Sequence, residues 1–390
     1  MDRRLVWLAV GAFATSTVAF VFAGLLPLIS ASAGISVSDA GHLVTVYSLA
    51  YAIGTPILST FAGAADRRRV IAAALLAFIA GNAAAASSGS FATLLAAQIV
   101  MGASAGLFAS TAQATAVALA GPEHRARAVA TVLGGTTFAV ALGAPLASLV
   151  GSLAGWRAAY LVVAGLALLC LAVLWLRLPR GLPGLKLSLR ERLAALGRPG
   201  ILPSLAVTLL YLTGGFIIIA YLGPLATEGA GLPVAMLPAL LLTFGIGAIA
   251  GNYASGQLAD RLGPGRMIVM ALLASSAICA SMTAILELLP PEIAGPALVA
   301  IMLPWGFVGW TFPPAQASRL VGHAPELANL TLPLNVSAMY FGIALGSFIG
   351  GRLLEAAPVA ELGIAAAAFP LAALAVIALT RRGTARVPAA

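Results

Sequence analysis

Long apolar runs follow one another along the chain, and short polar segments separate them. A helix needs about 20 mostly apolar residues to cross the hydrocarbon core of a membrane, and it satisfies its own backbone hydrogen bonds there. The pattern therefore predicts twelve membrane-spanning helices. They cover residues 5–30, 42–62, 70–88, 91–119, 127–151, 157–178, 200–226, 234–259, 266–289, 294–318, 327–353 and 358–380.

The composition leaves little room for any other class of protein. Hydrophobic residues make up 61% of the 390 residues, charged residues only 8%, and the mean hydropathy is +1.04. A soluble domain carries roughly 25% charged residues, so this chain cannot cover a water-exposed surface. Ordinary globular domains, disorder and a nucleic-acid-binding module are excluded. The long runs also exclude an outer-membrane barrel, whose strands are short and alternating. We expect an all-α protein surrounded by the lipid bilayer.

The excess of basic residues, a formal charge of +9, predicts the orientation of these helices. With twelve spans, both termini and the even-numbered loops share one side of the membrane. That side holds all 21 Lys and Arg residues except Arg157 and Arg352. Because Lys and Arg concentrate in cytoplasmic loops, both termini are expected on the cytoplasmic side of the membrane.

A polar stretch at residues 179–199 divides the spans into two sets of six. Its leucines recur at helical spacing, which predicts a basic amphipathic helix on the inner leaflet. We therefore expect an N-terminal half (1–178), a linker (179–199) and a C-terminal half (200–390). Short sequences recur at equivalent places in the halves: Asp66-Arg67 with Asp260-Arg261, and Ala141-Leu142-Gly143 with Ala344-Leu345-Gly346. Two such halves with a site between them are an architecture of secondary transporters.

One loop carries a longer motif. Residues 256–266, GQLADRLGPGR, fit the loop signature G-x-L-A-D-R-x-G-x-x-R of the major facilitator superfamily, which the chain resembles over nearly its whole length. More narrowly, residues 20–27, 142–146 and 155–157 resemble the bacterial twelve-span drug:proton antiporters and arabinose-type sugar-efflux permeases. The resemblance implies the major facilitator fold, with two pseudo-symmetric six-helix halves, and a cavity between the halves.

Proton coupling, which the resemblance implies, lacks its usual residues here. Many of the efflux proteins carry an acidic residue where this chain has Ala19, and an Arg where it has Gln98. The spans hold no Asp, Glu, Lys or Arg near mid-depth, although such groups usually mark an ion path. The remaining titratable candidates lie near the outer mouth, Asp39 and His42 at the second span and Glu228 after the seventh, and Asp39 is the candidate for proton coupling. The alternative is that each is a solvated loop charge.

Charged loop residues and two helix-bending residues are candidates for conformational control. Asp and Arg at helix ends form charge-assisted hydrogen bonds that break when a transporter opens. The alternative is that these charges only set the orientation of the helices. The candidates are Asp260, Arg261, Arg266, Asp66 and Arg67 in the loops, and Gly143 and Pro145 in the fifth span.

A cavity between the halves, as the resemblance implies, would be lined by aromatic and uncharged polar residues of spans 1, 2, 4, 5, 7, 8, 10 and 11. The alternative is that these residues only pack helices together through hydrogen bonds. The candidates near mid-depth are Thr17, Phe20, Tyr47, Tyr51, Phe108, Gln113, Thr136, Phe138, Tyr211, Phe244, Trp305, Trp310, Asn335, Met339 and Tyr340.

The prediction for function is a secondary active transporter that exports a small neutral or amphipathic compound (a drug, sugar or metabolite). Proton antiport is implied by the resemblance. A uniporter or importer of a neutral solute is the first alternative, and a multispan membrane enzyme the second. His42, His124 and His323 are scattered, so we expect no enzyme, metal site or cofactor. The expected partners are the substrate, the bilayer and protons, without nucleic acid, and a monomer is expected.

Overall fold

The structure is a computed structural model that describes residues 3–120, 124–182, 189–324 and 327–384. Twelve helices within these residues are long and apolar enough to cross a membrane, which confirms the predicted number. Six belong to the first half: α1 (Arg3–Ala33), α2 (Val37–Phe61), α3 (Arg67–Ala86), α4 (Phe91–Ala120), the α5–α6 span (Arg125–Phe138 and Ala144–Ala154) and α7 (Trp156–Arg177). Six belong to the second half: α9 (Ile201–Ile219), α11 (Leu237–Leu262), α12 (Pro264–Leu288), α13 (Pro291–His323), α14 (Ala328–Ala356) and α15 (Glu361–Thr384).

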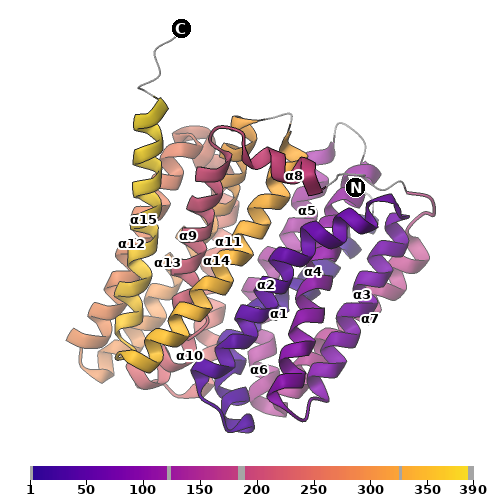
Figure 1. Cartoon of the computed structure of the whole chain (residues 1–390). Helices are drawn as coiled ribbons and strands as arrows, with labels where there is room; N and C mark the ends of the chain where they lie inside the picture. The colour runs from indigo at the N-terminus through magenta and orange to yellow at the C-terminus, as the bar shows by residue number, and fades with distance from the viewer. Residues whose placement is uncertain (1–2, 121–123, 183–188, 325–326, 385–390) are drawn as a thin grey trace.

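The halves lie side by side as two groups of tilted helices (Figure 1). The start of α1 and the end of α15 lie at the same face of the bundle, which we call the terminal face, and the other end of the bundle is the opposite face. The seam between the halves is formed mainly by α2 against α14, and by α11 against the α5–α6 span. Near the opposite face α1 also meets the short helix α10 (Leu222–Pro224), which follows α9.

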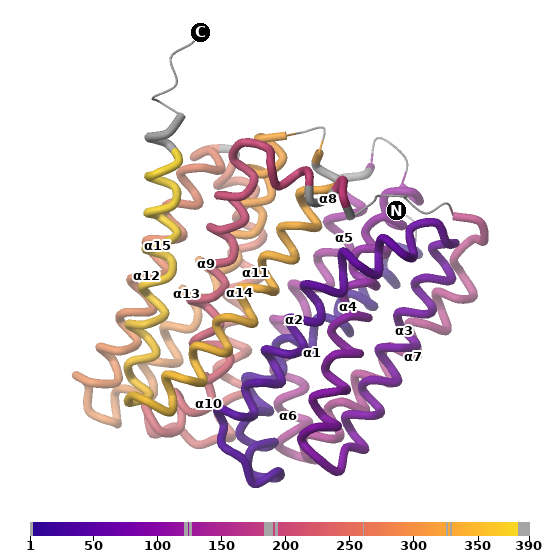
Figure 2. The backbone as a smooth tube through the Cα atoms, viewed as in Figure 1, coloured from indigo at the N-terminus to yellow at the C-terminus, as the bar shows by residue number. Residues whose placement is uncertain are grey.

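The described part of the linker lies over the seam at the terminal face (Figure 2). Its described part contains α8 (Leu189–Leu196), where the leucine spacing predicts a helix. This helix packs against α14 and α2, one from each half. Lys186, within residues 183–188, lies outside the described residues.

The fifth span is broken where the sequence predicts one continuous helix. A single wide turn at Ala139–Gly143 separates α5 from α6, and the Ala144 N–H donates to the Ala139 carbonyl five residues back. Pro145, the residue after Ala144, has no N–H to donate. The regular backbone hydrogen bonds of an α-helix therefore cannot continue through this position. Gly143 lies at the end of this wide turn. A Cβ at Gly143 would lie 2.3 Å from the Thr17 hydroxyl, so glycine is what lets α1 approach here.

Candidate functional site

An aromatic layer crosses the seam at mid-depth. Phe20 of α1 extends toward the second half, where its ring centroid lies 5.7 Å from that of Phe216 and 6.0 Å from that of Trp310. Phe244 of α11 continues the layer, 5.0 Å from Trp305 and 5.9 Å from Trp310. Four of these five residues were expected at the cavity. Phe216 was missed, because its apolar stretch does not distinguish a seam position from a core position.

Two tyrosines from different halves form a stacked pair, which we call the tyrosine pair. The rings of Tyr51 on α2 and Tyr340 on α14 are 3.5 Å apart between centroids and inclined by only 11°. Both side chains are buried. Tyr47, one helical turn from Tyr51, donates from its hydroxyl to the Thr15 carbonyl of α1 at 3.0 Å, which fixes α2 against its own half. Separating α2 from α14 must therefore part the tyrosine pair.

A narrow crevice lies next to the tyrosine pair on the side of the terminal face. It is lined by Thr55 and Pro56 of α2 and by Pro333, Leu334 and Ser337 of α14. Thr55 is one turn from Tyr51, and Ser337 is one turn from Tyr340, so the crevice and the stack occupy the same seam.

Other cavity candidates lie elsewhere. Phe138 is 51% exposed and shares an outward stripe with Leu142 and Leu146, so it faces the surroundings of the bundle and lies apart from the aromatic layer. Tyr211 stacks on Phe312 at 4.0 Å within the second half. Gln113 and Met339 are half-buried, and Phe108 is buried in the core. Thr17 contacts the fifth span, as does its neighbour Ser16, whose hydroxyl is 3.2 Å from that of Thr136.

Asn335 belongs to a buried polar cluster inside the second half. Its amide oxygen accepts a hydrogen bond of 2.7 Å from the Thr208 hydroxyl. Gln316 of α13 donates to that same hydroxyl and to the Ser204 carbonyl, so three helices are joined. Buried polar groups in an apolar surrounding need such partners. This arrangement favours helix packing as the role of Asn335, and Gln316 is a structural residue that the sequence analysis missed.

The seam near the opposite face is closed by hydrogen bonds that we call the opposite-face latch. The Ser347 hydroxyl of α14 donates to the Gly41 carbonyl of α2 at 3.0 Å, across the two halves. Tyr221, between α9 and α10, donates from its hydroxyl to the Ser347 carbonyl at 2.8 Å. A Cβ on Gly41 would lie 1.9 Å from the Tyr221 hydroxyl, so glycine forms the socket for this side chain.

Asp66 and Arg67 hold the terminal face of the first half together. The Asp66 carboxylate caps α3 by accepting from the Arg68 N–H at 2.8 Å, and it accepts at the same distance from the Gly181 N–H of the linker. The Gly181 hydrogen bond is the main reason that the pKa of Asp66 is lowered. Arg67 is buried and donates to the Ala114 carbonyl of α4. These contacts fix α3, α4 and the start of the linker.

The matching loop of the second half is described only in part. Arg261 and Arg266 are exposed at the terminal face. The Asp260 side chain lies outside the described residues, so its role stays a prediction.

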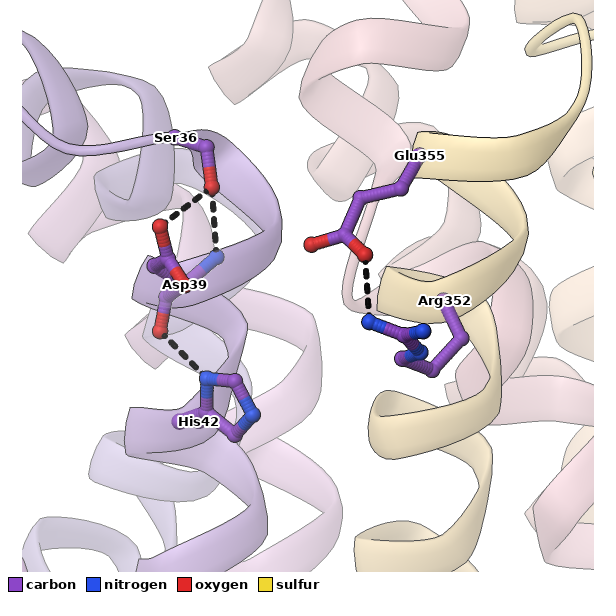
Figure 3. Close-up of polar contacts among 5 residues, drawn as sticks. All are labelled: Ser36, Asp39, His42, Arg352 and Glu355. Carbon is purple, nitrogen blue, oxygen red and sulfur yellow. Dashed lines mark hydrogen bonds and ion pairs between the residues drawn. The ribbon is translucent and has the colours of Figure 1, made fainter.

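Asp39 lies at the opposite face in a local set of hydrogen bonds (Figure 3). The Ser36 hydroxyl donates to its carboxylate at 2.7 Å, and the Asp39 N–H donates back to that hydroxyl at 2.9 Å. His42 approaches the Asp39 carbonyl at 3.0 Å with its Nδ1. Ser36 and Asp39 together cap the start of α2. The described arrangement thus gives Asp39 a structural role at an exposed position.

The aromatic layer and the tyrosine pair contain no charged side chain. Within the described residues, no group of three or more His, Cys, Asp or Glu side chains is arranged to hold a metal ion. Both cysteines, Cys170 and Cys279, are buried singly. The seam is therefore able to bind through apolar and aromatic contacts and through the hydroxyl and indole N–H groups of Tyr and Trp.

Comparison with known proteins decides the family. The family model described as Major Facilitator Superfamily matches residues 8–350. The chain belongs to the major facilitator superfamily. Members of the superfamily are transporters, so this chain is a transporter of a small molecule across a membrane and not an enzyme.

Curated members of the superfamily resemble the chain along most of its length. The inner membrane transport protein YdhP of Escherichia coli K12 is 30% identical, over 91% of this chain and 90% of that protein. A chloramphenicol resistance protein of Streptomyces lividans is 31% identical, over 96% of this chain and 88% of that protein. A solved D-xylose-proton symporter shares the major facilitator fold, with a TM-score of 0.77, 16% identity and coverage of 95% and 96%.

Proposed function

We propose that the chain exports a small neutral or amphipathic organic compound by alternating access through the seam between its halves. The observation that carries this proposal is the uncharged aromatic layer with the tyrosine pair at mid-depth. A strongly charged solute would lose its hydration there without gaining a partner of opposite charge. Export, as the direction, is supported by similarity to a protein named for chloramphenicol resistance.

The proposed cycle alternates between two ways of closing the seam. The opposite-face latch closes one face while a solute reaches the tyrosine pair through the crevice beside Thr55 and Ser337. Release then requires the latch to break and the terminal side to close. The wide turn before Pro145 gives the fifth span a place to bend, and Asp66 with Arg67 keeps the terminal face of the first half rigid during that motion.

The proposed setting is a bacterial inner membrane with both termini in the cytoplasm. The basic residues of the terminal face support this orientation. The proposed energy source is a proton gradient, used through antiport, because the chain resembles the antiporter branch. A uniporter or importer of a neutral solute is the second candidate, and Ala19, in place of the acid common in the efflux proteins, favours it.

An efflux assay in drug-sensitive bacteria tests this proposal. Cells that express the chain are loaded with neutral antibiotics, lipophilic cations, sugars or amino acids, and the compound retained is measured over time. We expect faster loss of a neutral or amphipathic compound. Tyr51→Leu and Trp310→Leu should weaken this loss, whereas Phe138→Leu, a change on the outward stripe, should not. Equal loss in cells with and without the chain, for every compound, would overturn the proposal.

A further inference from the structure

Among the Lys and Arg side chains that the structure describes, two lie on the opposite face, Arg157 and Arg352, and their contacts differ. Arg352 of α14 forms an ion pair with Glu355, with 2.7 Å between the guanidinium nitrogen and the carboxylate oxygen (Figure 3). Its charge is therefore balanced by a residue one turn away. Arg157, at the start of α7, has no such carboxylate among the described residues.

The contacts of Arg157 position its guanidinium without neutralising it. One nitrogen donates to the Ser88 carbonyl, between α3 and α4, at 3.1 Å. The guanidinium carbon lies 4.2 Å from the ring centre of Trp156. A carbonyl and an indole ring both favour a cation, but neither carries a negative charge. Arg157 is also exposed, so the positive charge remains available to an anion from outside the chain.

A pocket of about 350 Å³ opens beside this guanidinium. Its walls come from the end of α1, through Leu28 and Ser32, and from the end of α6, through Gly151 and Ala154. Arg157 and Trp156 form the third side. The first turn of the 22-residue helix α7 lies at this pocket, and the positive end of its dipole adds to the charge of Arg157. The pocket thus combines an apolar wall with a positive rim.

An apolar track leads from the middle of the bundle to this pocket. One side of the α5–α6 span exposes a row of leucines, which we call the leucine stripe: Leu142, Leu146, Leu149 and Leu153. Leu153, the last of them, is 80% exposed. The next residue, Ala154, lines the pocket. Along a membrane-spanning helix such a stripe faces acyl chains. The pocket therefore lies where an acyl chain on the stripe would end in its polar headgroup.

We propose that this pocket binds the phosphate headgroup of an anionic phospholipid, with the phosphate on Arg157 and one acyl chain along the leucine stripe. Arg binds phosphate through paired, charge-assisted hydrogen bonds. The lipid would join α1, α6 and α7 at the opposite face of the first half. This site lies apart from the tyrosine pair, so it does not depend on which compound the seam transports.

The test measures lipid retention by the purified, detergent-solubilised transporter in native mass spectrometry. Dioleoyl phosphatidylglycerol is compared with dioleoylglycerol, which lacks the phosphate, and with inorganic phosphate as a competitor. We expect retention of phosphatidylglycerol over dioleoylglycerol. Arg157→Gln should weaken phosphatidylglycerol binding about tenfold, the range for loss of a hydrogen bond to a charged group. Arg352→Gln, the matched loss of charge on the same face, should bind as the wild type does.

A second variant separates lipid binding from the contact with Ser88. Ala154→Phe fills the pocket but keeps Arg157 and its hydrogen bond, so it should also release the lipid. Unchanged retention in Ala154→Phe would overturn the proposal, and so would equal losses in Arg157→Gln and Arg352→Gln. Full displacement of the lipid by inorganic phosphate would assign the site to a free anion and overturn the lipid as its occupant.

Discussion

Replacing Gly41 by alanine should open the opposite face. The added Cβ would lie 1.9 Å from the Tyr221 hydroxyl and 2.8 Å from the ring carbon that bears it. Both distances are too short for a non-bonded contact of a Cβ atom, so the Tyr221 side chain has to move. Its hydroxyl would then leave the Ser347 carbonyl, to which it donates at 2.8 Å. The Ser347 to Gly41 hydrogen bond depends on the same close approach of α2 and α14.

The size of the effect follows from the lost hydrogen bond of Tyr221 and from the strain of the added methyl group. A hydrogen bond of this kind contributes about 1 kcal/mol, and forcing a methyl group into a packed core costs about 1–3 kcal/mol. The strain falls on the state in which the opposite face is closed, because Tyr221 meets Gly41 only across the closed seam. We therefore expect the closed state to be disfavoured by about 2–4 kcal/mol, which is roughly 30- to 900-fold in the ratio of the two states.

Spin-label distance measurements test this expectation. Labels on cysteines introduced at Ser90 and Glu292, exposed positions of the two halves at the opposite face, report the separation of the halves. Gly41→Ala should shift the distribution to longer distances. The control is Gly215→Ala, which adds the same methyl group where nothing lies within 4 Å. The reasoning is refuted if Gly41→Ala gives the same distribution as Gly215→Ala.

Three further changes have defined outcomes. Asp66→Asn should lower the thermal midpoint at pH 7, with a difference from the wild type that shrinks under acidic conditions. The folded-state pKa of Asp66 lies below its usual value of 3.8, so its stabilisation is present above that value and is lost as the pH falls through the folded-state pKa. Gln316→Leu should destabilise the protein by about 1–3 kcal/mol in thermal unfolding, because it leaves buried polar groups unpaired, whereas Gln113→Leu, at a half-buried position, should cost less. Pro145→Ala restores a backbone N–H beside the wide turn, and it should slow turnover in a transport assay while the apparent substrate affinity stays unchanged.

The number and order of the helices could be predicted from the sequence because length and hydropathy alone decide whether a segment crosses a membrane. The breaks inside spans could not. The apolar run at 127–151 gives no sign that hydrogen bonding changes register at Ala139–Gly143. Likewise, the run at 200–226 hides the end of α9 at Ile219 and the turn at Tyr221. Hydropathy averages over such local changes in the backbone.

The site was predictable only where residue chemistry differs between the seam and the outer surface. Tyr51, Trp305 and Tyr340 stood out because polar aromatic groups are rarely placed in lipid without a partner. Phe138 was also named as a cavity candidate but is 51% exposed, and the sequence could not show this because lipid and protein core are equally apolar and a phenylalanine suits both. The opposite-face latch joins Ser347 to Gly41, which are 306 residues apart, and a serine and a glycine in apolar runs carry no signal of that contact.

Transport into inverted membrane vesicles tests the central proposal most directly. The vesicles are energised, a neutral or amphipathic compound that the efflux assay has identified is added, and its accumulation is followed with and without a proton uncoupler. The account predicts accumulation against the gradient that the uncoupler abolishes and that Tyr51→Leu strongly reduces. Uptake that only equilibrates, with the uncoupler making no difference, would contradict proton-driven export and would identify the chain as a uniporter.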